Sequence, residues 1–147
     1  MEWIALVTWV LTAGGGFVML ALWLKHGGMR QADADRIRSA RILSHFALAA
    51  GGLVVWIVYL ATDSDGLAWL AFGLLAVVAV LGFSMLAIWL RQRSREPAPA
   101  GARRVDSTRE APPAEQRFPT PVVAVHGLLA ATTLVLVLLV AAGIGES

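Results

Sequence analysis

Cysteine is absent from this sequence of 147 residues, and charged residues are scarce at 15% of the total. Without cysteine the chain contains no disulfide, no thiolate metal site and no thiol nucleophile. Soluble domains carry about 25% charged residues, whereas 58% of this sequence is hydrophobic. The composition is typical of a membrane protein, and a net charge of only +2 gives no indication of nucleic-acid binding.

Catalytic motifs are also missing. The sequence shows no phosphate-binding loop and no serine–histidine–aspartate set. No carboxylate lies inside the apolar stretches described below, so the usual feature of an intramembrane ion or proton path is lacking. The chain has one lysine beside eleven arginines, which suggests a GC-rich bacterial genome. We therefore predict a small bacterial membrane protein that is not an enzyme and acts as an accessory or interaction subunit.

Four apolar stretches are present, at residues 3–24, 42–61, 67–90 and 121–143. Each has about 20 residues or more, enough for a helix to cross a hydrocarbon core about 30 Å thick. Backbone polar groups in lipid must be satisfied internally, so these stretches are expected to be helices. The sequence predicts an all-α integral membrane four-helix bundle.

The basic residues predict the orientation of these spans. All twelve lie in the connections between the first and second spans or between the third and fourth, whereas the opposite side carries only Glu2, Asp63, Asp65 and Glu146. The positive-inside rule places loops 25–41 and 91–120 in the cytoplasm and both termini outside. The expected location is the bacterial inner membrane. Trp3 and Trp69 then lie at the outer boundary and Trp23 and Trp89 at the inner one, where tryptophan commonly anchors helices.

The connections differ in composition. Residues 92–118 are rich in proline, alanine and mixed charge without apolar periodicity, which predicts a disordered cytoplasmic linker. Residues 63–66 predict a short outer turn. Residues 31–46 consist mostly of helix formers, which predicts that the second span begins early, with Asp33 and Asp35 near its start.

The two halves of the sequence resemble each other. Residues 16–25 read GFVMLALWLK and residues 82–91 read GFSMLAIWLR, at an offset of 66, while HFALAAGGLV at 45–54 aligns with HGLLAATTLV at 126–135, at an offset of 81. These matches predict a duplicated transmembrane hairpin, with residues 1–62 as the first copy and 67–143 as the second. A parallel repeat implies a pseudo-two-fold axis along the membrane normal.

The second offset aligns His45 with His126, and both residues are expected in the inner leaflet, about one turn inside the cytoplasmic edge. Small residues follow each histidine on the same helical face, which is typical of the packed face of a membrane helix. Both imidazoles are therefore expected to face the bundle interior. The simplest role for each is a structural hydrogen bond to a neighbouring carbonyl or hydroxyl group.

Two inward histidines at the same depth can also bind one haem iron axially. This layout resembles the membrane-embedded four-helix b-type cytochromes, and the resemblance implies a single haem b between His45 and His126. The sequence leaves another metal or a quinone headgroup open. Met19 and Met85, aligned by the first offset, are possible copper ligands together with the histidines. The expected partners are the lipid bilayer and another membrane protein or a second copy of the chain.

Overall fold

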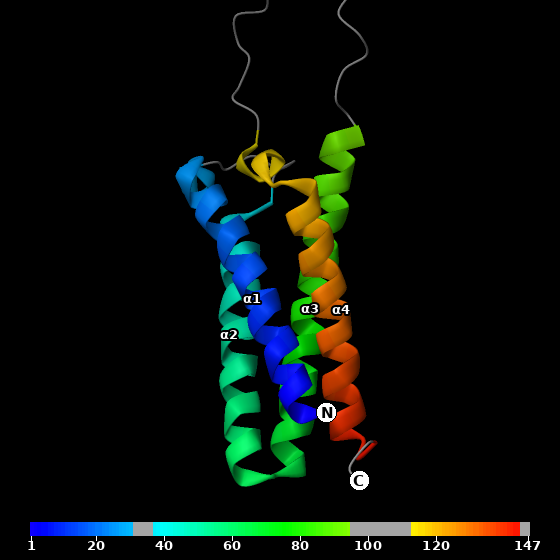
Figure 1. Cartoon of the computed structure of the whole chain (residues 1–147). Coiled ribbons are helices and arrows are strands. Elements are labelled where there is room, and N and C mark those ends of the chain that lie inside the picture. Colours follow the sequence, from blue (N-terminus) through cyan, green and yellow to red (C-terminus); the bar gives the residue numbers. More distant parts are fainter. Residues whose placement is uncertain (31–36, 95–112, 145–147) are drawn as a thin grey trace, which may run out of the picture.

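The computed structural model describes residues 1–30, 37–94 and 113–144, and these residues form an all-α bundle (Figure 1). Each of its four long helices is long and apolar enough to cross a membrane. The helices are α1 (Glu2–Lys25), α2 (Ser39–Thr62), α3 (Asp65–Ser94) and α4 (Thr120–Ala141). Two short 3-10 helices, η1 (Gly28–Arg30) and η2 (Ala114–Arg117), precede α2 and α4. The predicted all-α four-helix bundle and its four candidate spans are confirmed, which indicates a multi-pass membrane protein.

Successive long helices run in opposite directions, so the bundle has two distinct ends (Figure 1). The start of α1, the turn between α2 and α3 and the end of α4 lie at one end, which we call the terminal end. The end of α1, the start of α2, the end of α3 and the start of α4 lie at the other, which we call the loop end. The most extensive packing joins α2 to α3 and α1 to α4. As a result α1 lies diagonally across the bundle from α3, and α2 lies diagonally across from α4.

The turn between α2 and α3 is shorter than predicted. Asp63 ends α2 in the left-handed conformation at φ 52°, and its N–H donates to the Tyr59 carbonyl at 2.8 Å. Aspartate is one of the few residues that adopt this conformation readily. Because α3 already begins at Asp65, only Asp63 and Ser64 of the predicted turn 63–66 lie outside the helices.

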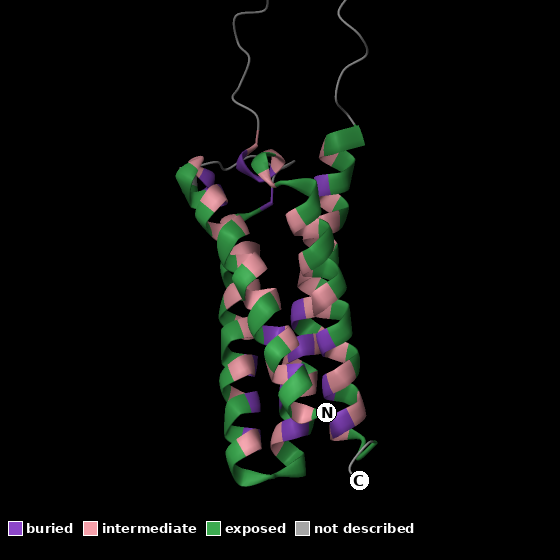
Figure 2. Cartoon of the chain, in the orientation of Figure 1, coloured by how far each residue is buried: buried purple, intermediate pink, exposed green. Residues whose placement is uncertain are grey.

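Most fully buried side chains gather in the half of the bundle nearer the terminal end (Figure 2). Trp56 lies at the centre of this group, with ring centroids 6.4 Å from Trp9 and 4.8 Å from Tyr59. The Tyr59 hydroxyl donates to Glu2 at 2.6 Å and so links the start of α1 to α2. The group, which we call the terminal core, comprises Ala5, Trp9, Trp56, Tyr59, Ala68, Ala71, Leu75, Val137 and Val140.

Burial follows the two sequence offsets. Each buried residue of α1 aligns with a buried residue of α3 that lies 66 positions later. Each buried residue of α2 aligns with a buried residue of α4 that lies 81 positions later. These buried pairs are Ala5 with Ala71, Trp9 with Leu75, Trp23 with Trp89, Gly52 with Thr133, Trp56 with Val137, and Tyr59 with Val140. The corresponding helices therefore present the same faces to the interior, even where the side chains differ.

A second buried group closes the loop end, and we call it the cap: Trp23, Gly28, Ile37, Trp89, Ala114 and Glu115. Its central residue is Glu115 of η2, which is 1% exposed. The Ile37 N–H and the Gln92 side-chain amide both donate to one Glu115 carboxylate oxygen, each at 2.9 Å. The Trp89 indole N–H donates to the Glu115 carbonyl at 3.1 Å. Glu115 thus connects the chain before α2, the end of α3 and the chain before α4.

The cap corrects two predictions about the connections. Residues 92–94 continue α3 and residues 114–117 form η2, so the disordered linker 92–118 is wrong at both ends, where Gln92 and Glu115 bind each other. Its remaining residues, 95–112, lie outside the described part of the chain. The second span does begin before its apolar stretch, at Ser39, but the predicted extension is wrong at Ile37, whose N–H binds Glu115, and at Arg38, which is extended. Residues 31–36, including Asp33 and Asp35, also lie outside the described ranges.

The tryptophans divide into two kinds. Trp3 and Trp69 at the terminal end are 67% and 48% exposed, consistent with a position against lipid headgroups. Trp23 and Trp89, predicted as anchors at the opposite boundary, are buried in the cap instead. A side chain at Gly28 would overlap the Trp23 indole, so this glycine is required for the close approach of the chain after α1.

Candidate functional site

His45 projects from α2 against the backbone of α3. Its Nδ1 lies 3.0 Å from the Val78 carbonyl oxygen. A Cβ at Gly82 would lie 3.2 Å from His45 Cε1, which is tighter than ordinary van der Waals contact. The imidazole therefore approaches α3 closely because residue 82 has no side chain.

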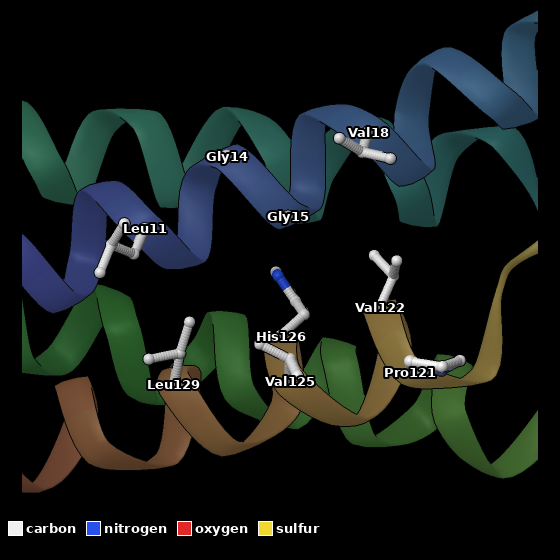
Figure 3. Close-up of a pocket in the computed structure, with 9 residues that line it drawn as sticks. All are labelled: Leu11, Gly14, Gly15, Val18, Pro121, Val122, Val125, His126 and Leu129. Atoms are coloured by element: carbon white, nitrogen blue, oxygen red, sulfur yellow. The ribbon is translucent and has the colours of Figure 1, made fainter.

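His126 occupies the equivalent position on α4, against the backbone of α1. Its Nδ1 lies 2.9 Å from the Thr12 carbonyl oxygen, and a Cβ at Gly16 would lie 3.3 Å from His126 Cε1. Figure 3 shows the imidazole directed from α4 towards α1, close to Gly15. Thr12 corresponds to Val78 and Gly16 to Gly82 at the offset of 66, so the two histidines make matching contacts in the two halves.

The two rings face each other across the bundle, with centroids 6.5 Å apart and planes inclined at 54°. A carbonyl oxygen can only accept a hydrogen bond, so Nδ1 must carry the proton in each His–carbonyl bond. A neutral imidazole protonated at Nδ1 has a free lone pair at Nε2, the form in which histidine binds metals. Within the described residues, neither Nε2 has a hydrogen-bond partner.

The histidines lie in a loosely packed layer between the terminal core and the cap. We call this the histidine layer; it comprises residues 10–22, 38–51, 79–88 and 116–132. None of these residues is fully buried, and both histidines are half-buried. Figure 2 shows this zone, with little purple, between the buried positions at the two ends. The fully buried residues thus lie on either side of the depth at which the two imidazoles face each other.

The separation of the rings fits two imidazoles on opposite sides of one metal ion. Metal–nitrogen bonds of about 2.0–2.1 Å and a ring radius of about 1.1 Å place trans imidazole centroids about 6 Å apart, close to the observed 6.5 Å. No group of three or more His, Cys, Asp or Glu side chains able to hold a metal occurs in the part of the chain that the structure describes. Two histidines alone leave a bare ion short of ligands, whereas a porphyrin supplies four further nitrogens to its iron.

Met19 and Met85 lie three residues beyond Gly16 and Gly82, towards the loop end, and both are half-buried. Residues three apart share a helix face, so the thioethers belong to the faces of α1 and α3 that carry these glycines. His26, the third histidine of the chain, is separate from this layer. Its Nδ1 lies 2.7 Å from the Leu22 carbonyl oxygen at the end of α1.

A groove of about 330 Å³ lies between α1 and α4 beside His126 (Figure 3). Its α1 wall is formed by Leu11, Gly14, Gly15 and Val18. Its α4 wall is His126 with four apolar neighbours, among them Val122 and Val125. The imidazole is therefore the only strongly polar side chain on an otherwise apolar lining.

The sequence indicated the histidine pair and its depth but not Glu115. Glu115 lies 78 residues from Ile37 and 23 from Gln92, in a segment without helical periodicity. A single carboxylate among prolines and arginines carries no sequence signal for burial, so its role depends on long-range contacts.

Comparison with protein-family models, curated proteins and solved structures finds no match for this chain. The fold and the site therefore define only a class: a four-helix membrane bundle with a pair of histidines facing each other in its interior.

Proposed function

We propose that this chain is a b-type cytochrome-like membrane protein that holds one haem between His45 and His126. The observation that carries the proposal is the facing of two imidazoles from diagonal helices, with Nδ1 bound to backbone carbonyls and Nε2 free. The absence of fully buried residues from the histidine layer supports it, because a flat prosthetic group needs room inside the bundle.

The protein's own contribution is to hold and orient the ligands. The carbonyls of Val78 and Thr12 fix the tautomer and plane of each ring, and such hydrogen bonds increase the basicity of a ligating imidazole. Gly82 and Gly16 let the rings lie close to the neighbouring helices. When bound, haem iron supplies one-electron oxidation and reduction. The chain is then an electron carrier and not an enzyme.

The histidine content limits the number of haems. The chain has three histidines, and His26 lies outside the histidine layer, beyond the end of α1. Only one bis-histidine site is therefore available. A single haem near one end of the bundle does not carry electrons across the bilayer without a redox partner, so an association with another membrane protein is part of the proposal.

The second candidate is an accessory subunit without a cofactor, which interacts with another membrane protein or with a second copy of the chain. The observation that favours it is that each Nδ1 already has a backbone carbonyl as its partner. Such a bond makes a half-buried histidine tolerable without any ligand. Duplication of the hairpin would copy a histidine with a purely structural role just as it would copy a haem ligand, so the repeat does not distinguish the two.

We further propose a duplicated hairpin in the bacterial inner membrane, with both termini outside and loops 25–41 and 91–120 in the cytoplasm. The matching buried pairs support the duplication, because they extend to positions where the two halves differ in residue type, such as Trp56 and Val137. In the sequence every basic residue lies outside the four apolar stretches, in the connections between the first and second or between the third and fourth, and this supports the orientation.

An absorption spectrum of the protein purified from haem-replete cells tests the function. We expect a Soret band and sharp α and β bands after reduction, which disappear in His45→Ala and in His126→Ala. His26→Ala is the matched control and should keep the spectrum. A colourless protein without bound metal contradicts the haem proposal and favours the accessory subunit. Bound copper that is lost in Met19→Leu and Met85→Leu favours the copper site instead.

A further inference from the structure

Arg41 lies one helical turn from His45, on the side towards the loop end. The two residues are four positions apart in α2, which is about 6 Å along the helix axis. Arg41 also lies about five full turns before Tyr59 and about three before Gly52, so all three share one face of the helix. Both Tyr59 and Gly52 are buried. Arg41 therefore belongs to the face of α2 that is turned towards the bundle interior.

The burial of Arg41 sets it apart from the other basic residues. Arg41 is half-buried. The other basic residues whose side chains the structure describes are all exposed: Lys25, Arg38, Arg91, Arg93 and Arg117. Among the described residues, the Arg41 guanidinium has no hydrogen-bond or ion-pair partner. Partial burial of a cation without a partner is unfavourable, and a guanidinium binds a carboxylate well through parallel N–H bonds.

The repeat gives no structural reason for an arginine at this position. At the offset of 81, Arg41 corresponds to Val122, whereas His45 corresponds to His126. Since α2 and α4 bury matching positions, the packing common to the two halves is compatible with an apolar side chain at this point. The arginine is therefore a feature of one half only, and a role in binding explains it better than a role in packing.

The proposed haem carries its negative charge on one edge, where its propionate carboxylates lie. A haem plane stands across the line joining its axial ligands, and that line joins α2 to α4, so the plane runs along the bundle. Towards the terminal core, the carboxylates would meet apolar and aromatic side chains such as Trp9 and Leu75. Towards α1 and α3 they would meet residues 10–22 and 79–88, which include no cation. A half-buried cation is present only in the direction of the loop end, within the part of the chain that the structure describes.

We infer that Arg41 binds the haem propionates and thereby sets the orientation of the haem, with its carboxylate edge towards the loop end. This inference rests on the proposed haem site. The side chains of a helix lean towards its N-terminus, and α2 begins at the loop end, so Arg41 extends away from His45 in that direction. The propionates also extend away from the iron, beyond the edge of the macrocycle. The guanidinium and the carboxylates are thus displaced from the axial ligand in the same direction.

Titration of the haem-free protein in detergent with haemin and with haemin dimethyl ester, followed at the Soret band, tests the inference. The ester has the same macrocycle and iron but no free carboxylate. We expect Arg41→Met to bind haemin about tenfold more weakly than the unmodified protein does and to bind the ester equally well, because only haemin loses a charge-assisted hydrogen bond. Partition of each ligand into detergent is the same for every variant and does not affect this comparison. Arg91→Met is the matched control, since Arg91 is an exposed arginine in the last turn of α3. It should bind both ligands like the unmodified protein.

The outcomes separate this inference from the proposed function. If the unmodified protein binds neither ligand, the proposed function fails and the inference fails with it. If both ligands bind and Arg41→Met leaves their affinities unchanged, or weakens both equally, Arg41 does not bind the carboxylates and the haem site stands. An equal loss for haemin in Arg91→Met also overturns the inference, because the effect is then one of overall charge. Circular dichroism and gel filtration establish folding. Should Arg41→Met not fold, Arg41→Gln decides by the same comparison of the two ligands.

Discussion

Trp56 and Trp89 are both buried indoles, but they differ in the environment of the N–H group. Trp89 donates to the Glu115 carbonyl, whereas the Trp56 N–H has no hydrogen-bond partner among the described residues. Trp56 therefore contributes through its rings, which contact Trp9 and Tyr59. A buried donor without a partner is itself destabilising.

We expect Trp89→Phe to lower the free energy of unfolding by about 1 kcal/mol more than Trp56→Phe. Both changes remove the same atoms, so the loss of packing is similar, but only Trp89→Phe breaks a hydrogen bond. Denaturant unfolding in detergent, followed by circular dichroism, measures the difference. Equal losses in the two variants would show that the Trp89–Glu115 bond does not stabilise the protein.

At the scale of elements, the carboxylate and the backbone carbonyl of Glu115 both hold η2 in the cap. Glu115 accepts hydrogen bonds from Ile37, just before α2, and from Gln92, in the last turn of α3. We expect Glu115→Ala to lower the free energy of unfolding by about 1–3 kcal/mol, because the buried Ile37 N–H loses its acceptor. Glu115→Gln keeps a side-chain carbonyl oxygen and should lose less.

Limited proteolysis of the loop end provides an independent measurement of the same element. Releasing η2 should expose the segments on either side of it, so Glu115→Ala should be cleaved faster between residues 113 and 119 than Glu115→Gln. Identical cleavage of both variants and the unmodified protein would contradict the role of the carboxylate in holding η2 against the bundle.

The helices and the cap show where sequence analysis succeeds and where it does not. Long apolar stretches predict membrane helices because length and composition are local properties, and all four helices match the predicted spans to within a few residues. The alignment of His45 with His126 is also visible in the sequence. The contacts of Glu115 and the burial of Trp23 are not, because they depend on which distant segments fold over the loop end. The haem ligation and the copper site stay predictions.

At the scale of the whole molecule, stability and the candidate site occupy different zones along the bundle. The fully buried residues of the described chain all lie outside the histidine layer, most of them in the terminal core and the cap. If the layer is filled by a cofactor, filling it should stabilise the whole bundle, because a ligand that binds only the folded state shifts the unfolding equilibrium. We expect the melting temperature to rise with added haemin in the unmodified protein and to stay constant in the double variant His45→Ala/His126→Ala.

The orientation of the whole bundle can be tested cleanly because the chain contains no cysteine. Ser64 lies in the α2–α3 turn at the terminal end, Ser94 ends α3 at the loop end, and both are exposed. Serine and cysteine have nearly the same shape, so Ser64→Cys and Ser94→Cys form a matched pair that introduces one thiol at either end. In the proposed orientation the loop end faces the cytoplasm. A membrane-impermeant maleimide added to cells with a permeabilised outer membrane should therefore label Ser64→Cys, and should label Ser94→Cys only after the inner membrane is disrupted. The reverse pattern would invert the topology and place the histidine layer in the outer leaflet, and labelling of both thiols in intact cells would show a mixed orientation.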